Sequence, residues 1–189
     1  MMQQFKMTLG LGVLAAGLTG CAATGLSSEA FEITKAECQA AITHLSNTEP
    51  EFDGLVNSSA GWAVFPGEFS GIYWALGGAG SDGLVYNNSG EVMGYSRHAR
   101  VNLGFGSLGQ YSDVVIFFPT QEDMDAFQNS KFEFGGEVAA GILGLGASGQ
   151  MAFTDNMEYV SDPRSAFGIG AYFTFDSYSY NDINTAMSN

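Results

Sequence analysis

The chain has 189 residues, of which 46% are hydrophobic and 14% charged, and this composition is typical of one packed globular domain and not of a disordered chain. It carries 20 acidic and 6 basic residues, a net charge of -14. An acidic surface repels nucleic-acid phosphates, so nucleic-acid binding is not expected. The same charge argues against simple electrostatic docking on anionic lipids, which needs clustered lysine and arginine.

The first twenty residues, Met1–Gly20, have the pattern of a bacterial signal peptide. Lys6 and the amino terminus are positive, and Met7–Leu18 is apolar but too short to span a bilayer as a helix. The string Leu18–Cys21 (LTGC) then resembles the bacterial lipobox. In proteins of that class a diacylglycerol is attached to the cysteine thiol. The chain is cut before the cysteine, and the new amine is acylated with a fatty acid such as palmitate.

We therefore expect Cys21 to carry lipid, Cys21–Ser28 to form a lipidated tether and residues 29–189 to form a single domain. Several acyl chains anchor a protein durably, since each buried methylene contributes about 0.8 kcal/mol. Residue 22 is alanine and not aspartate, which by resemblance to sorted lipoproteins favours the outer membrane, facing the periplasm. Cys38 is then left without a partner, so we expect no intrachain disulfide and interpret Cys38 as a small buried apolar residue.

Ser28 is expected to cap a helix over residues 29–45. An apolar stripe at helical spacing predicts that this helix packs on the domain; its members are Phe31, Cys38, Ala41, Ile42 and Leu45. A helix lying on a membrane is the alternative, which three glutamates and a single lysine oppose. Residues 47–61 are expected to form a loop or a short second helix.

From Trp62 onward the pattern predicts short strands over residues 62–66, 71–79, 83–86, 91–97, 114–118, 132–141, 150–154 and 165–176. Pro66 is expected to end the first strand. Gly80–Gly83 is expected to be a hairpin turn, and Asn87–Gly90 a second turn.

Between these strands, Thr120 with Asp123 three residues later predicts an N-cap and a short helix to about Gln128. The order of elements predicts an α+β domain. Its parts would be a twisted antiparallel β-sheet, an N-terminal helix and one or two short helices.

Sequence motifs give no support for a cofactor, a metal or catalysis. Three GxGxxG matches begin at Gly78, Gly104 and Gly144, but a dinucleotide site needs a helix after the glycines and strands are predicted there. The chain has no GxSxG, no HExxH, no paired cysteines and no EF-hand loop. We interpret the acidic loops at residues 49–53 and 155–158 as solvated, with weak calcium binding as the alternative. We expect no enzyme, cofactor or metal site.

The one basic cluster is Arg97-His98-Ala99-Arg100. It could contact a phosphate headgroup, or it could pair with some of the many carboxylates. The two arginines are expected to lower the pKa of His98, so this histidine is not expected to act as an activated base.

Five segments in succession carry a family resemblance: AGWAVFP (60–66), GGAGSDGLVY (77–86), EVMGYS (91–96), VNLGFGSLGQYSDVVIFF (101–118) and KFEFGGEVAAGILGLGASG (131–149). Over roughly residues 45–180 the chain resembles the SYLF-domain, or lipid-binding, family. The resemblance implies lipid or membrane binding without known catalysis. Eukaryotic relatives bind phosphoinositides through basic N-terminal segments. The first helix here is acidic, so neither that specificity nor an actin-related role is carried over.

Strand periodicity divides the many aromatic residues between two faces, and most of the rings are expected in the core. Glycines opposite aromatic residues would let the sheet open a narrow apolar cleft. We expect Trp74 and Tyr73 to line it, with Arg97 or Arg100 at its mouth to meet a headgroup. The expected function is thus a membrane-anchored lipoprotein with a non-catalytic lipid-binding domain. The alternative is a structural or partner-binding envelope lipoprotein with no lipid ligand of its own.

Overall fold

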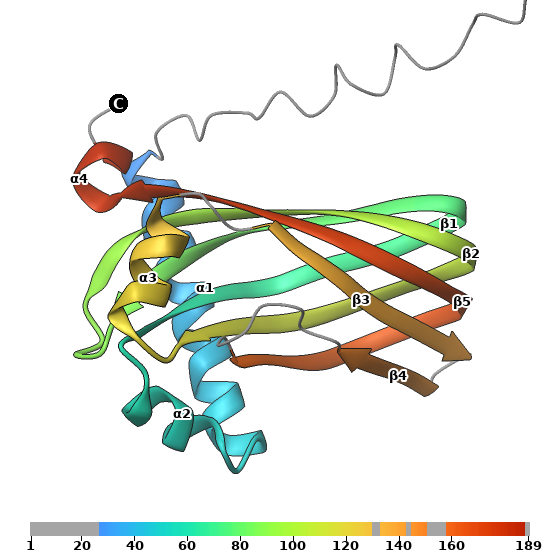
Figure 1. The fold of residues 1–189 in the computed structure, drawn as a ribbon, viewed down its shortest axis with the longest axis horizontal. Helices are drawn as coiled ribbons and strands as arrows, with labels where there is room; N and C mark the ends of the chain where they lie inside the picture. Colours follow the sequence, from blue (N-terminus) through green and yellow to red (C-terminus); the bar gives the residue numbers. More distant parts are fainter. Residues whose placement is uncertain (1–26, 130–132, 143–144, 151–157, 188–189) are drawn as a thin grey trace, which may run out of the picture.

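The computed structural model describes residues 27–129, 133–142, 145–150 and 158–187, those between 133 and 175 as backbone (Figure 1). It shows the predicted α+β fold, an antiparallel sheet of strand order β1-β2-β5-β3-β4 with an N-terminal helix and short helices. Met1–Gly20, Cys21, Phe132 and residues 151–154 lie outside the described residues, as do the side chains of the predicted strand 165–176 before Asp176. Within the described part, no helix is both long enough and apolar enough to cross a membrane.

The N-terminal helix α1 (Ser28–Thr48) packs on the domain as its stripe predicted. Its buried residues are Phe31, Thr34, Cys38, Ala41 and Leu45, and Ile42 packs partly buried beside them. The cap is Ser27 and not Ser28, because the Ser27 hydroxyl accepts a hydrogen bond from the Ala30 amide. The first turn therefore starts one residue earlier than expected.

Three long strands replace most of the short strands that were predicted: β1 (Gly61–Asn87), β2 (Val92–Phe118) and β5 (Glu158–Asp182). Strand β2 pairs with β1 on one side and with β5 on the other. Two shorter strands, β3 (Glu133–Ile142) and β4 (Leu145–Gln150), continue the sheet beyond β5. Figure 1 shows each long strand running to one end of the molecule and bending back there.

Close contacts within β1 show that its two halves lie side by side. The Trp62 and Tyr86 rings stack with centroids 5.9 Å apart. A Cβ on Gly83 would lie 2.2 Å from the Val64 carbonyl oxygen, and one on Gly77 would lie 1.9 Å from the Gly71 carbonyl oxygen. Such distances leave no room for a side chain, so glycine at these two positions lets the halves approach.

Pro66 does not end the first strand, which corrects one prediction. The register shifts between Phe65 and Glu68, where β1 has an extra residue. Gly67 takes a positive φ of 58°, and its amide donates a 2.8 Å hydrogen bond to the Asp113 carboxylate of β2. The proline and glycine thus make a β-bulge instead of a strand end. The bulge changes the alternation, so Phe65 and Glu68 both face the interior and both contact His98.

The hairpin turn predicted at Gly80–Gly83 is also wrong, because β1 is extended through these residues. Asp82 pairs with Arg97 across the β1–β2 ladder, and Ser81 hydrogen-bonds to Glu68. The chain instead reverses near Trp74, where φ is 65° and the register shifts before Leu76. The second predicted turn, Asn87–Gly90, does connect β1 to β2.

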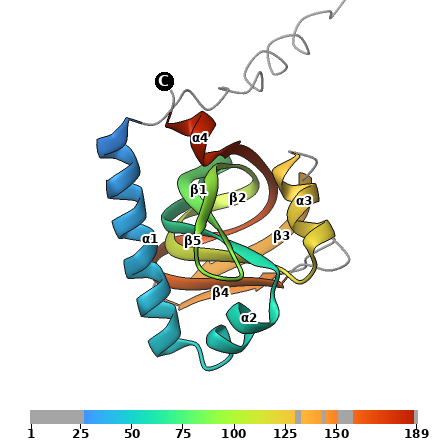
Figure 2. The same ribbon diagram turned by 90° about the vertical axis from the view of Figure 1, so that its left-hand side faces the viewer.

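The short helices close the fold and divide the core in two. Helix α2 (Phe52–Ser58) confirms the short-helix alternative for that segment, and α4 (Ile183–Ala186) was not predicted. Helix α3 (Gln121–Gln128) begins with the predicted capping box of Thr120 and Asp123. Figure 2 shows α1 and α3 on different sides of the strands.

Each side has its own apolar cluster. One joins α1, α2 and α4 to the sheet through Trp62, Leu84 and Phe117. The other joins α3 to Phe65, Ile116 and Phe118. The neighbours Phe117 and Phe118 therefore bury opposite faces of β2, as strand alternation predicts.

Replacing Gly77 by alanine should disrupt the contact between the two halves of β1. The new Cβ would overlap the Gly71 backbone, so we expect the free energy of unfolding to fall by about 3 kcal/mol or more. Gly54 in α2 has open space around it. Gly54→Ala should therefore stabilise slightly, by about 0.5–1 kcal/mol. Urea unfolding of both variants provides the measurement. Equal stability of the two variants would contradict the folded-back arrangement of β1.

Candidate functional site

The end of the molecule where the long strands bend back exposes large apolar side chains. We call this surface the aromatic tip and define it by Tyr73, Trp74, Leu76, Leu103 and Phe105. Tyr73, Trp74 and Phe105 are 71%, 75% and 83% exposed. Solvent exposure of this much aromatic surface in one place is unusual for a monomeric protein and marks an interaction site.

The chain around the aromatic tip has no charged residue. Neither residues 69–81 of β1 nor residues 101–112 of β2 include aspartate, glutamate, lysine or arginine. Acidic side chains lie elsewhere, for example Glu29, Glu32 and Glu37, which are exposed on α1. The molecule therefore separates an acidic body from a neutral, apolar end.

Backbone geometry brings the tip residues together. Trp74 lies opposite Gly106 and Leu76 opposite Leu103, with a register shift between these pairs. In the part of the chain that the structure describes, Trp74 is the one non-glycine residue at positive φ. A bulky residue in that conformation costs on the order of 1–2 kcal/mol. The fold holds the Trp74 ring outward in spite of this strain.

Beside the tip lies a shallow apolar hollow with a volume of about 340 Å³. The aromatic residues in its wall do not lie opposite glycines, because Phe69 pairs with Tyr111 and Tyr73 with Ser107, and Trp74 is not in its wall. Its lining residues are Phe69, Gly71, Ile72, Tyr73, Leu76, Gly77, Gly78, Ser107, Leu108 and Gly109. Tyr73 therefore lines the hollow, whereas Trp74 lies outside it and is 75% exposed.

The two arginines are not at the mouth of this hollow, which corrects another prediction. Arg97 forms a 2.9 Å ion pair with Asp82 and donates a hydrogen bond to the Tyr95 hydroxyl at 3.1 Å. Arg100 is only 6% exposed and contacts the carboxylates of Glu68 and Asp176. Of the two interpretations of the basic cluster, pairing with carboxylates is the one that the structure shows.

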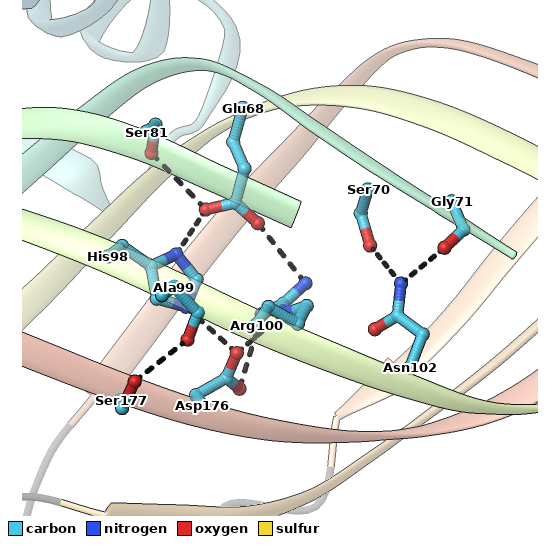
Figure 3. A network of polar contacts seen from close by, with 10 residues as sticks. All are labelled: Glu68, Ser70, Gly71, Ser81, His98, Ala99, Arg100, Asn102, Asp176 and Ser177. Atoms are coloured by element: carbon cyan, nitrogen blue, oxygen red, sulfur yellow. Dashed lines mark hydrogen bonds and ion pairs between the residues drawn. The ribbon is translucent and has the colours of Figure 1, made fainter. Parts of the chain in front are cut away.

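Arg100 belongs to a buried network in the centre of the molecule (Figure 3). Its members come from three strands: Glu68 from β1, His98 and Arg100 from β2, and Asp176 from β5. The Arg100 guanidinium lies 3.3 Å from Glu68 Oε1 and 2.5 Å from Asp176 Oδ1. His98 Nε2 lies 2.8 Å from the same Asp176 oxygen, and His98 Nδ1 contacts Glu68 Oε2.

Both ring nitrogens of His98 face carboxylate oxygens, so both must carry a proton to donate. Burial by itself would lower the pKa of His98, but the Glu68 charge and the hydrogen bonds to both carboxylates outweigh burial and raise it. The predicted lowering by the neighbouring arginines is therefore wrong: Arg97 pairs with Asp82, and the effect of Arg100 is smaller than that of Glu68. With His98 protonated, two cations balance two carboxylates.

Burial likewise works against the ionised forms of Glu68 and Asp176, yet both pKa values are lowered. For Glu68 the main opposing causes are the charge and hydrogen bond of His98, followed by the charge of Arg100. For Asp176 they are the hydrogen bond of His98 and the charge of Arg100. The four groups thus keep one another ionised in the interior.

This network of Glu68, His98, Arg100 and Asp176 has a structural role. His98 and Glu68 are fully buried, and both nitrogens of the His98 ring are engaged. The nearby Ser81 hydroxyl donates to Glu68 over 3.4 Å and is not paired with His98. Arg100 occupies the space between the two carboxylates where a cation would sit. Among the described residues no group is placed to hold a metal ion.

Cys38 and the glycine motifs also take structural roles. The Cys38 thiol is fully buried, burial raises its pKa to about 12, and it lies 3.6 Å from the Val64 carbonyl oxygen. The GxGxxG segments at Gly78 and Gly104 lie inside β1 and β2, and strand continues directly after each of them. The predicted interpretation of the thiol as an apolar core residue is confirmed.

Sequence reasoning found His98 and Arg100 but missed Glu68 and Asp176. Glu68 is 30 residues from His98, and Asp176 is 78 residues from it. A usable signal was the charge-poor surroundings of Glu68, because an isolated carboxylate in an apolar strand needs a buried cationic partner.

No protein-family model, curated protein or solved structure matches the chain. The SYLF resemblance therefore rests on the sequence motifs alone, and what it implies is treated below as a proposal.

The raised pKa of His98 predicts a specific pH dependence of stability. Above an unfolded-state pKa of about 6.5, the folded protein holds a proton that the unfolded chain has released. The free energy of unfolding should therefore fall as the pH rises above 6.5, by at most about 1.4 kcal/mol per pH unit, until the pH passes the raised folded-state pKa. The lowered pKa values of Glu68 and Asp176 add a separate loss of stability below about pH 4. Stability should peak between these ranges.

A His98→Gln variant tests the source of this slope. It should lose about 3 kcal/mol at pH 6, because a buried carboxylate is left uncompensated, and it should lack the decline above pH 6.5. His44→Gln changes the other histidine, which is exposed on α1, and should keep both the stability and the slope. Urea unfolding at several pH values measures both quantities. An unchanged slope in His98→Gln would rule out His98 as its origin.

Proposed function

We propose that this protein is a bacterial lipoprotein, anchored through acylated Cys21, whose domain binds lipid surfaces through the aromatic tip without catalysis. The observation that carries the lipid-binding part is the exposure of Tyr73, Trp74 and Phe105 on a surface free of charge. The LTGC string supports the anchor. The SYLF resemblance supports lipid binding on separate grounds.

The chemistry of the tip suits the boundary between headgroups and acyl chains. Tryptophan and tyrosine favour this boundary because each has an apolar body and a polar group. Burying one phenylalanine side chain contributes roughly 1.5–3 kcal/mol. Insertion of Trp74 and Phe105 would therefore give a reversible attachment, whereas the acyl chains on Cys21 give a durable one.

Lipid binding through the tip should be insensitive to headgroup charge. Arg97 and Arg100 already pair with carboxylates, and the chain has a net charge of -14. The proposal thus assigns the arginines no headgroup contact. Binding by apolar insertion should vary little with salt, unlike electrostatic docking.

The alternative is a partner-binding or structural envelope lipoprotein in which the tip contacts another protein. The same exposed rings would serve such a contact, because aromatic residues also dominate protein interfaces. We favour lipid because the SYLF resemblance points the same way. For either function we propose the outer membrane, facing the periplasm, as the location, and no cofactor.

Cys21 should be the point of attachment. Intact-mass measurement of protein extracted from bacterial membranes should show the loss of Met1–Gly20 and the added mass of a diacylglycerol and a fatty acid. Cys21→Ser should move the protein out of the membrane fraction, whereas Cys38→Ser should not. An unmodified Cys21, or a mature chain that begins elsewhere, would contradict the anchor.

The aromatic tip should bind vesicles without the anchor. In a mature chain carrying Cys21→Ser, the fluorescence of Trp74 should shift to the blue on addition of phosphatidylcholine vesicles. The other tryptophan, Trp62, is 5% exposed and should contribute no shift. Trp74→Gly with Phe105→Ser should reduce co-sedimentation at least tenfold. Glycine at position 74 also removes the positive-φ strain, so the variant should fold at least as well.

Ile33→Ser is the matched control, because Ile33 is 53% exposed on α1, away from the tip. It should bind vesicles like the parent. If the tip variant also binds like the parent, the lipid contact lies elsewhere. If the parent binds no vesicles of neutral or anionic composition, the domain does not bind lipid and the partner-binding alternative takes its place.

A further inference from the structure

The aromatic tip and the start of α1 lie at opposite ends of the molecule. Figures 1 and 2 both show α1 beginning beside α4, and Figure 1 shows that this end lies away from the bends of β1 and β2. Phe31 near the start of α1 packs in the same apolar cluster as Trp62 near the start of β1. The route from the anchored end to the tip therefore follows the first half of β1.

Two lengths can be compared along this route. From Trp62 to Trp74 there are twelve residues of strand, or about 40 Å at 3.3 Å per residue, and about 35 Å if the strand is inclined to the long axis. From Cys21 to Ser28 there are seven residues, which span about 25 Å when fully extended. The tether is shorter than the distance that separates the tip from the tethered end.

The position of the aromatic tip at one end of the long axis determines the orientation in which it can insert into a membrane. Tyr73, Trp74 and Phe105 lie where the strands reverse, so they enter a bilayer together when the long axis stands upright on it. The start of α1 would then be about 35–40 Å above that bilayer, beyond the reach of the tether. End-on insertion and anchoring through Cys21 thus require two different membranes.

The charge distribution also opposes a molecule that lies flat on its own membrane. The exposed acidic residues of the body include Glu29, Glu32, Glu37, Glu51 and Asp53. A flat orientation would bring such carboxylates close to anionic lipid, which is unfavourable. An upright orientation leaves the acidic body between the two surfaces, where it is solvated.

We propose that the protein bridges two lipid bilayers, with acylated Cys21 in one and the aromatic tip inserted in the other. This proposal rests on the lipid-binding function proposed above and names the surface that the tip binds. The occupant of the tip is a second bilayer that carries no copy of the protein.

The test uses full-length protein that has been processed in the cell, extracted with detergent and reconstituted into phosphatidylcholine vesicles fixed to beads. Fluorescent phosphatidylcholine vesicles without protein are then added, and those that the beads retain are measured. The parent should retain at least fivefold more than beads without protein. Trp74→Gly with Phe105→Ser should abolish the difference, and Ile33→Ser should preserve it.

A longer tether distinguishes bridging of two bilayers from other ways in which the beads could retain vesicles. Inserting about twenty glycine and serine residues between Leu26 and Ser27 would let the tip reach its own membrane. Capture should then fall several-fold, and brominated lipid in the anchoring vesicle should quench Trp74 fluorescence. In the parent, only brominated lipid in the added vesicle should quench it.

Failure of this proposal and failure of the proposed function give different results. If the Cys21→Ser chain binds free vesicles but the anchored parent captures none, and its Trp74 is quenched by lipid of its own membrane, bridging is overturned and lipid binding stands. If the Cys21→Ser chain binds no vesicles, both are overturned. Equal capture with the short and the long tether would also overturn the geometric basis of bridging.

Discussion

The buried network of Glu68, His98, Arg100 and Asp176 is the interaction on which the arrangement of the long strands depends. It joins β1, β2 and β5 at one level of the interior. Two carboxylates balance one guanidinium and one imidazolium, so no net charge is buried. Removing any one member would leave a buried charge without its partner, which costs far more than the intact network contributes. The network therefore specifies which strand positions face one another.

The β-bulge at Pro66–Gly67 is what allows this network to form. Without the extra residue, strand alternation would put Phe65 and Glu68 on opposite faces. The bulge places both inside, where the Phe65 ring lies 5.6 Å from the His98 ring. The Asp113 carboxylate holds the bulge through the Gly67 amide. One local irregularity thus connects the apolar core around α3 to the polar layer beyond it.

Sequence reasoning correctly predicted the structural features that depend on residues close together along the chain. The stripe of α1 and the capping box of α3 involve residues three to seven positions apart, and both are confirmed. The strand bounds failed where one signal has two structural meanings. Pro66 marks a bulge as well as a strand end, and Gly83 serves close packing on Val64 as well as a turn. The side-chain network could not be predicted, because placing Glu68 and Asp176 around His98 and Arg100 requires knowledge of the sheet order.

Predictions about the candidate site succeeded and failed for the same reasons. Trp74 and Tyr73 were identified from the aromatic residues and glycines of their predicted strand, a local property. The expected role of Arg97 and Arg100 failed because their partners, Asp82 and Asp176, come from other positions in the ladder. A cluster of basic residues in an acidic chain is more readily neutralised inside the protein than presented to a ligand.

Trp74 gives the strongest physical reason to look for a binding partner at the tip. Its side chain is 75% exposed, so it contributes little to the core, while its positive φ costs on the order of 1–2 kcal/mol that glycine would not incur. Glycine is abundant in this chain, with 26 residues, and occupies the opposite position, Gly106. A strained, exposed tryptophan contributes little to the stability of the isolated fold. Its ring gains favourable free energy only when an apolar surface covers it, and a bilayer offers such a surface to every ring of the tip at once.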